Sequence, residues 1–239
     1  MTELLCQQDS YLKEFDAEII SVDAESRVVV LDRTVFYPGG GGQPCDVGLL
    51  SVNGREYPVI KVKKQGADAL HFLGGDAETP EVGSSVHGVI DWERRYQLMR
   101  THTAMHILCG VVFRDYGALV TGGNMEPLKG RMDFEFETMH GELVAEIEAA
   151  INEAAQQSYD VKVNVLSREE AFRIPDLIRT KINLLPEGIN EIRTIEIAGL
   201  DLQADGGTHV KNTSEVGKLR VTNYKSKGKI NKRIYVEVA

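Results

Sequence analysis

A proline-free segment, residues 91–113, marks the point at which the chain changes from a strand pattern to a helix pattern. Before it, short runs rich in β-branched residues are separated by glycine-containing turns. Within it, apolar residues recur at helical spacing and lie nearly all round the helix, which is typical of a helix buried in a protein core. We therefore expect two domains, a β-rich domain at 1–90 and a second domain at 91–239 that begins with this helix.

Two histidines of this helix, His102 and His106, stand four positions apart, so their side chains leave the same face one turn apart. Farther along the chain, Asp205 and His209 flank two glycines that permit a tight turn. Imidazoles and carboxylates are zinc ligands, and we predict that these four residues bind one Zn²⁺ ion per chain. The alternative is that the histidines are buried, hydrogen-bonded residues without a metal. The zinc-protease motif His-Glu-x-x-His is absent, because Thr103 follows His102.

Three segments of the chain form a recognisable set. They are Phe36-Tyr-Pro-Gly-Gly-Gly-Gly-Gln-Pro44, Asp91-Trp-Glu-Arg-Arg-Tyr-Gln-Leu-Met-Arg-Thr-His-Thr-Ala-Met-His106 and Asp205-Gly-Gly-Thr-His-Val210. Together they resemble the editing domain of alanyl-tRNA synthetase and, more closely, the free-standing AlaX-type editing deacylases. The resemblance covers nearly the whole chain. The chain departs from the synthetase pattern in one respect, since that pattern has cysteine at the position of Asp205.

The resemblance implies a fold, a reaction and a substrate. The fold is α+β, with a small N-terminal β-barrel-like domain followed by an α/β editing domain in which helices pack on an antiparallel sheet. The reaction is the metal-dependent hydrolysis of misacylated tRNA(Ala), chiefly Ser-tRNA(Ala), to free amino acid and tRNA. At 239 residues the chain is too short to hold an aminoacylation domain as well, so we expect it to act in trans. Whether glycine is removed as well as serine is left open by the sequence.

The glycine-rich segment after Pro38 is the second candidate site. Four successive glycines do not form a helix, and on spacing alone a tight turn between strands explains them as well as a functional loop does. The Lys-Ser/Thr of a nucleotide-binding loop is missing. The resemblance favours a functional loop, in which the backbone amides of Gly40, Gly41 and Gly42 and the side chain of Gln43 face the aminoacyl end of the substrate.

Accepting serine while sparing alanine requires recognition of a hydroxyl group. By resemblance, the candidate catalytic residues for this role are Thr103 and Gln43. The alternative for Thr103 is a hydroxyl that bonds back to its own helical turn. Asp205 also has two possible roles, either as the fourth metal ligand or outside the coordination sphere as a base or as a residue that orients His209. The sequence does not distinguish a zinc ion that activates water from one that only positions the substrate.

The net charge of −9 is unevenly distributed along the chain. Between positions 211 and 233 there are eight basic residues and one acidic residue, a local charge of +7 that leaves −16 for the rest. Such a run of basic residues often forms only a solvent-exposed surface. A run that lies next to a candidate active site can instead bind the phosphates of an RNA backbone. We predict contacts with the acceptor-end phosphates of mischarged tRNA(Ala) from Lys225, Lys227, Lys229, Lys232 and Arg233.

The remaining segments predict ordinary α+β structure. We expect a hairpin at 16–32, short strands within 48–90, an amphipathic helix at 140–157 and further strands at 131–137, 160–166, 192–197, 216–224 and 230–238. In the strand at 160–166, Val161, Val163 and Val165 alternate with polar residues, which predicts that the strand is half-buried with the valines inside. Ser167 and Glu170 have the spacing of a helix capping box.

Composition limits the cellular setting. Cys6, Cys45 and Cys109 form no Cys-x-x-Cys pair, so we expect reduced thiols rather than disulfides or a thiolate zinc site. No long apolar run is present, and the first residues do not have the pattern of a signal peptide. These features predict a cytoplasmic protein without a membrane association. We infer no obligate protein partner, and the sequence does not reveal the oligomeric state.

Two other functions fit the same residues. The chain could be a non-catalytic tRNA-binding module whose histidines are structural. It could also be a metal-dependent hydrolase of small esters or amides, with the basic run unrelated to RNA. Binding of tRNA in the presence of a chelator distinguishes the first alternative from editing, and the salt dependence of activity distinguishes the second.

Overall fold

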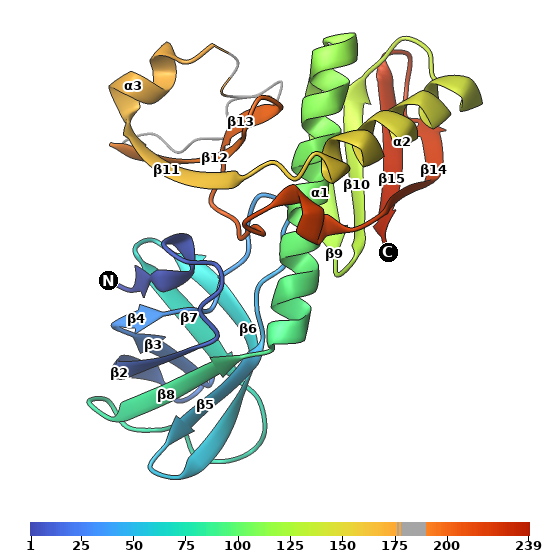
Figure 1. Ribbon diagram of the computed structural model, residues 1–239. Coiled ribbons are helices and arrows are strands. Elements are labelled where there is room, and N and C mark those ends of the chain that lie inside the picture. The colour runs from blue at the N-terminus through green and yellow to red at the C-terminus, as the bar shows by residue number, and fades with distance from the viewer. Residues whose placement is uncertain (176, 178–189) are drawn as a thin grey trace. The chain divides into compact units, whose positions relative to one another are not determined.

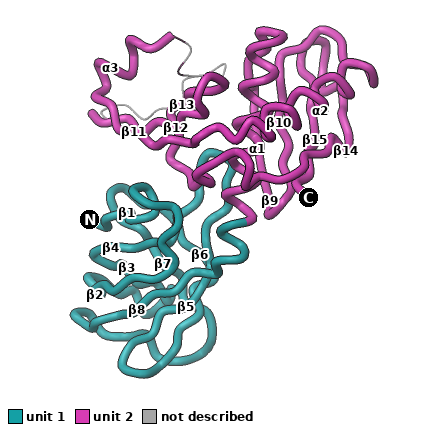
Figure 2. The backbone as a smooth tube through the Cα atoms, viewed as in Figure 1, with its two compact units in different colours: residues 1–96 teal, residues 97–239 magenta. Residues whose placement is uncertain are grey.

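The computed structural model describes residues 1–175, 177 and 190–239. The chain forms two compact units, unit 1 at Met1–Tyr96 and unit 2 at Gln97–Ala239 (Figure 2). The α+β class is confirmed, because unit 1 consists mainly of a β-barrel and unit 2 combines helices with antiparallel sheets. The division of functions between 1–90 and 91–239 stays a prediction. Among the described residues, no helix is both long and apolar enough to cross a membrane.

Six strands of unit 1 close into a barrel in the order β2-β3-β7-β6-β5-β8 (Figure 1). The strands are β2 (Glu14–Asp23), β3 (Val28–Leu31), β5 (Gly48–Val52), β6 (Arg55–Gln65), β7 (Asp68–Leu73) and β8 (Ser85–Ile90). The antiparallel pairing of β2 with β3 confirms the predicted hairpin. Beside the barrel strands, the short strands β1 (Glu3–Leu4) and β4 (Arg33–Thr34) pair in parallel, and a 3-10 turn, η1 (Leu5–Gln7), follows β1.

Alternate side chains of the barrel strands fill the interior of unit 1. Phe15 and Ile19 of β2 are buried in this core together with Leu31, Phe36 and Leu50. Burial of one such side chain stabilises the fold by about 1.5–3 kcal/mol. One glycine is needed for this packing, because a Cβ atom on Gly88 of β8 would lie 2.2 Å from the ring of Phe15.

Helix α1 (Trp92–Tyr116) contains 25 residues and confirms the helix predicted at 91–113. Its first five residues, 92–96, belong to unit 1, where the guanidinium of Arg95 is fully buried and forms an ion pair with Asp46. The rest of the helix belongs to unit 2, and its side chains from Leu98 to Val112 are almost all buried, as the apolar pattern predicts.

The larger sheet of unit 2 has four antiparallel strands in the order β14-β15-β10-β9. These are β9 (Val120–Glu126), β10 (Lys129–Glu135), β14 (Leu219–Ser226) and β15 (Asn231–Val238). Helix α2 (Gly141–Gln156) packs against β14 (Figure 1). Its buried stripe includes Val144, Ile147 and Ile151, which confirms the amphipathic helix predicted at 140–157.

The smaller sheet of unit 2 has three antiparallel strands in the order β11-β12-β13. These are β11 (Val161–Ser167), β12 (Glu191–Ile197) and β13 (Asp201–Ala204). The short helix α3 (Arg168–Arg173) begins with the predicted capping box, in which Ser167 and Glu170 exchange hydrogen bonds with each other's backbone N–H groups. A 3-10 turn, η2 (Thr213–Val216), precedes β14.

Three features of unit 2 differ from the sequence-based expectations. Val163 and Val165 are 41% and 60% exposed, so the prediction that β11 buries its valines is wrong. Strand β11 lies at the edge of its sheet. Alternation of apolar and polar residues along a strand does not show whether another layer covers the apolar face. The strand expected from position 216 begins at 219, because 213–216 form η2. Strands β9 and β13 were not predicted, since Gly122 and Gly123 weaken the strand pattern of β9 and β13 has only four residues.

Candidate metal centre

Helix α1 presents two buried imidazoles on one face of unit 2. His102 and His106 are 4% and 5% exposed, and their ring centroids lie 5.2 Å apart. This is the arrangement expected from an i, i+4 pair on a helix. The sequence therefore predicted their common direction from local geometry alone.

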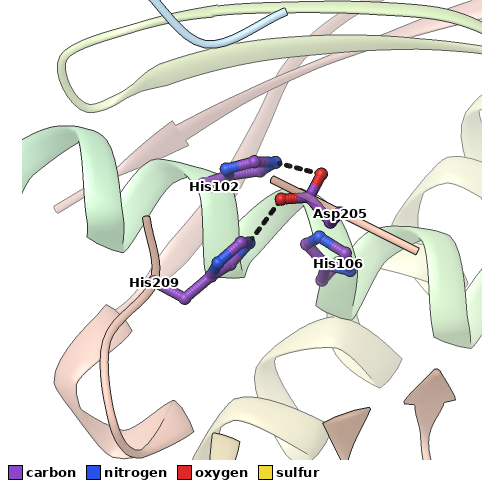
Figure 3. A group of neighbouring side chains, drawn as sticks. All are labelled: His102, His106, Asp205 and His209. Carbon is purple, nitrogen blue, oxygen red and sulfur yellow. Dashed lines mark ion pairs between the residues drawn. The ribbon is translucent and has the colours of Figure 1, made fainter. Parts of the chain in front are cut away.

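The segment after β13 brings two further candidate ligands to the same point (Figure 3). Gly207 N donates a hydrogen bond of 2.6 Å to Asp205 Oδ1, and this closes a tight turn. The turn is held by β12, because the guanidinium of Arg193 donates to the carbonyl oxygen of Asp205 over 2.8 Å. The ring centroid of His209 lies 4.2 Å from that of His102.

The four side chains form a compact group of donor atoms. One ligand atom from each of His102, His106, Asp205 and His209 lies within 4.8 Å of the others. Asp205 Oδ2 is 3.5 Å from His102 Nε2, and Asp205 Oδ1 is 3.8 Å from His209 Nε2. Ligands about 2.0–2.2 Å from a tetrahedral ion lie roughly 3.4 Å from one another. The spacing, the burial and the nitrogen and oxygen donors all fit a divalent ion such as zinc.

The charges of Asp205 and the histidines shift one another's pKa values. Burial alone would raise the pKa of Asp205, but the adjacent histidines hold that pKa well below its usual value, so the carboxylate is ionised. Burial and the charges of His102 and His106 together lower the pKa of His209 well below its usual value. Metal binding requires an ionised carboxylate and neutral imidazoles, and the pKa shifts of Asp205 and His209 are in the directions that favour those forms.

One residue of the site was missed by the sequence reasoning. Asp201, the first residue of β13, places Oδ2 2.8 Å from His106 Nδ1. Burial lowers the pKa of His106, but the hydrogen bond and charge of Asp201 outweigh this effect and raise it above its usual value. The signal available in the sequence was a second aspartate four positions before Asp205, just outside the segment singled out above.

Comparison with known proteins identifies the family. A family model described as tRNA synthetases class II (A) matches residues 7–94, and one described as threonyl and alanyl tRNA synthetase second additional domain matches residues 192–235. The alanyl-tRNA editing protein AlaX-M of Saccharolobus solfataricus is 40% identical over 240 residues, covering 100% of this chain and 99% of its own. The chain belongs to the AlaX-M family of alanyl-tRNA editing proteins.

Other relatives agree with this AlaX-M assignment. The AlaX-M protein of Methanosarcina mazei is 39% identical over 241 residues, covering 98% of this chain and 96% of its own. The alanine–tRNA ligase of Pyrobaculum aerophilum is 37% identical over 227 residues, which are 92% of this chain and 25% of the ligase. The similarity to the AlaX-M proteins thus extends over nearly the full length of this chain and of each relative. The similarity to the ligase covers only a quarter of the ligase.

Thr103 of this AlaX-M chain connects helix α1, which carries His102 and His106, to the segment that carries Asp205 and His209. Its side chain is fully buried, and Oγ1 accepts a hydrogen bond of 3.2 Å from Val210 N, next to His209. The hydroxyl that bonds back to its own helical turn is instead that of Thr101, which donates to Gln97 O over 2.7 Å. Thr103 therefore ties the turn after β13 to α1, and its assignment to hydroxyl recognition stays a prediction.

The glycine-rich loop belongs to unit 1. Gly39, Gly40, Gly41 and Gly42 all have positive φ angles, of 82°, 140°, 57° and 88°, which explains why residues with side chains are disfavoured here. Gly40 and Gln43 exchange two backbone hydrogen bonds, of 3.0 and 2.9 Å, across the turn, and the side chain of Gln43 is buried. The loop is thus a defined turn, and its contact with the substrate stays a prediction.

The five basic residues predicted to contact phosphates lie at the end of β14, in the following turn and at the start of β15. Lys225, Lys227 and Lys229 are exposed. Lys232 is 6% exposed, and its ammonium group donates to two carbonyl oxygens of the turn, those of Gly228 and Lys229. The guanidinium of Arg233 forms two hydrogen bonds, of 2.6 and 2.8 Å, with Asp133.

Proposed function

We propose that the protein hydrolyses misacylated tRNA(Ala), chiefly Ser-tRNA(Ala), in trans, with a divalent metal bound by His102, His106, Asp205 and His209. The observation that carries this proposal is the convergence of these four donors, three of them buried and Asp205 partly buried, in a chain that matches alanyl-tRNA editing proteins over its full length. The names of those relatives support the substrate class, and the donor set supports the metal. Zinc is the ion that we expect, with the cytoplasm as the site of action.

An aminoacyl ester is already activated, so the chemistry asked of the site is modest. A bound metal would polarise the ester carbonyl or lower the pKa of a water molecule. The residues of the chain supply the geometry: α1 fixes two imidazoles one turn apart, and Arg193 and Gly207 hold the turn that carries Asp205. Because these groups are ordered before substrate binds, little reorganisation is needed during the reaction.

The remaining proposed residues bind and select the substrate. The backbone amides of Gly41 and Gly42 and the side chain of Gln43 contact the aminoacyl end, while Gly40 N donates to Gln43 O and so holds the turn in shape. Thr103 contributes to recognition of the serine hydroxyl, since its oxygen already accepts one hydrogen bond and its own proton can be donated.

We propose that the exposed lysines Lys225, Lys227 and Lys229 contact acceptor-end phosphates directly. Lys232 and Arg233 act by shaping and supporting this turn, because their charged groups already bond to the turn carbonyls and to Asp133. The restricted extent of this basic turn on an acidic chain supports a small footprint on the tRNA.

Deacylation of Ser-tRNA(Ala) and Ala-tRNA(Ala), with and without a chelator, tests the proposal. We expect rapid release of serine, slow release of alanine, and loss of activity when the metal is removed and its return when zinc is added. Binding of tRNA without any hydrolysis would identify a non-catalytic module. Hydrolysis of small seryl esters at an equal rate, with no preference for tRNA, would identify a general metal-dependent esterase.

A further inference from the structure

We infer that Asp201 is a positioning residue of the metal centre: its carboxylate holds His106 in the tautomer and orientation in which Nε2 binds the metal. This inference rests on the proposed function, because it concerns the same centre. It assigns a role to a residue outside the four ligands, and the argument uses the packing of β13 against α1 rather than the ligands themselves.

The contact between the two residues is direct and buried. Asp201 Oδ2 lies 2.8 Å from His106 Nδ1, and the side chains are 0% and 5% exposed. An ionised carboxylate only accepts hydrogen bonds, so Nδ1 must carry the proton that is donated. The lone pair of the imidazole is then on Nε2, which is the one nitrogen of His106 left to bind a metal. A carboxylate partner also makes the imidazole a stronger ligand.

A second side chain fixes the carboxylate. Gln203 lies two positions along β13, on the same face of the strand as Asp201. Its Nε2 donates a hydrogen bond of 2.6 Å to Oδ2 of Asp201, the same oxygen that accepts from His106. With two donors on one oxygen, rotation of the carboxylate away from the imidazole breaks two hydrogen bonds instead of one.

Helix α1 has a glycine where the turn before β13 approaches it. Gly110 lies one turn beyond His106 on the same helical face. A Cβ atom on Gly110 would lie 2.9 Å from Cγ and the carbonyl oxygen of Leu200 and 3.1 Å from Cβ of Asp201. The absence of a side chain at Gly110 thus allows Asp201 to reach His106. Helix α1 therefore supplies both the metal ligand, His106, and the glycine that makes room for Asp201.

These contacts give a series of variants that separates carboxylate chemistry from packing. Asp201→Asn keeps the shape and an oxygen acceptor but removes the charge, and Asp201→Ala removes the acceptor as well. Gly110→Ala leaves the carboxylate in the chain but pushes the backbone of β13 away from α1. Asp115→Ala is the matched control, because Asp115 lies on the exposed end of α1 and bonds to Arg114.

The measurement is the dissociation constant for Zn²⁺, obtained by competition with a chromophoric chelator at one fixed pH. Partners of metal-binding histidines typically contribute a factor of about 10–100 in metal affinity. We expect a weakening of about 10–100-fold for Asp201→Ala, a smaller one for Asp201→Asn, a measurable one for Gly110→Ala, and none for Asp115→Ala. The visible absorption of Co²⁺-substituted protein should change in Asp201→Ala, because the His106 ring is free to turn.

Two results would overturn the inference, and they have different consequences for the proposed function. If the unmodified protein binds zinc and Asp201→Ala binds it within twofold of the same affinity, the proposed function survives and the role of Asp201 does not. If the unmodified protein binds no divalent metal, both fail together. Should Asp201→Ala not fold, as judged by circular dichroism, the isosteric Asp201→Asn and Gly110→Ala variants decide the question.

Discussion

Gly207 N donates a hydrogen bond of 2.6 Å to Asp205 Oδ1. This bond fixes the carboxylate within its own turn and directs the other oxygen, Oδ2, to a point 3.5 Å from His102 Nε2. Oδ2 is therefore the oxygen that our proposal assigns to the metal.

Replacement of Asp205 tests its role as a ligand. We expect Asp205→Ala to lower zinc content well below one ion per chain, and Asp205→Cys to keep or strengthen zinc binding, because a thiolate carries the same charge and suits zinc. Asp205→Asn keeps the acceptor for Gly207 and serves as the control for the turn. Metal analysis by mass spectrometry, beside single-turnover deacylation, provides the readout. Full zinc occupancy in Asp205→Ala combined with a much reduced rate would instead make Asp205 a base or an orienting residue.

Neutralising the exposed lysines of the turn after β14 tests the tRNA contact. In the triple variant of Lys225, Lys227 and Lys229 to glutamine, we expect the KM for charged tRNA to rise. The slope of log KM against log salt should fall by about 0.7–0.9 for each phosphate that a lysine no longer neutralises. Hydrolysis of a seryl-adenosine ester should hardly change, because it lacks these phosphates.

The matched control for the lysine experiment lies in unit 1. Lys61, Lys63 and Lys64 of β6 are also exposed, and their replacement by glutamine removes the same number of positive charges. An equal effect of the two sets of variants would mean that overall charge, and not a local contact, governs tRNA binding.

The ion pair of Arg95 and Asp46 predicts a large stability effect in unit 1. Arg95 also donates to the carbonyl oxygens of Ser10 and Val35, and Asp46 accepts from Tyr37 N over 2.6 Å at the base of the glycine-rich loop. Asp46→Ala leaves a buried guanidinium unpaired, so we expect a loss of about 3–5 kcal/mol in the free energy of unfolding. Arg33→Ala, which breaks an exposed pair with Asp32, should cost at most about 1 kcal/mol.

Urea unfolding followed by Trp92 fluorescence measures this effect. Trp92 is the single tryptophan of the chain and packs against the barrel core. A loss below about 1 kcal/mol for Asp46→Ala would show that water or a neighbouring group replaces the carboxylate.

The elements that the sequence predicted are those whose signal is local. Helix α1, the capping box of Ser167 and Glu170, and the pair of His102 and His106 each depend on spacings of three or four residues within one element. The Asp205 and His209 turn was found because both ligands and both glycines occur together. In each case the structure or the ligand set can be predicted from neighbouring residues, without knowing which distant segments of the chain come into contact.

The elements that were missed depend on tertiary packing. Asp201 reaches His106 because Gly110 lets the start of β13 approach α1, and no spacing within either segment encodes that approach. The predicted phosphate contact of Lys232 stays a prediction; its bonds to the carbonyl oxygens of Gly228 and Lys229 were not predicted, because they depend on the conformation of the turn. The exposed valines of β11 are a further case, since a strand's own pattern does not determine whether another layer covers that face of the sheet.

His71 of β7 predicts how the stability of unit 1 depends on pH. Its imidazole is fully buried in the barrel, 2.9 Å from Thr34 Oγ1, and burial lowers its pKa to about 4 from the usual 6.5. The folded state therefore keeps this ring neutral at pH values where the unfolded chain binds a proton. Since only the unfolded state is stabilised by that proton, the free energy of unfolding should fall as the pH is lowered from 6.5 towards 4, by about 1.4 kcal/mol per pH unit at most. At pH values well above 6.5 this group should contribute no pH dependence, because the ring is then neutral in both states.

The His71→Phe variant isolates this contribution. It keeps a ring beside Phe36 but cannot titrate, and it leaves the hydroxyl of Thr34 without its imidazole partner, so we expect it to be less stable than the unmodified protein at pH 7. On acidification, all other titrating groups act alike in both proteins. The difference in unfolding free energy, followed by Trp92 fluorescence, should therefore shrink steadily between pH 6.5 and 4. Parallel stability curves across that range would mean that the barrel admits a proton to His71 without cost, and that burial does not hold the ring neutral.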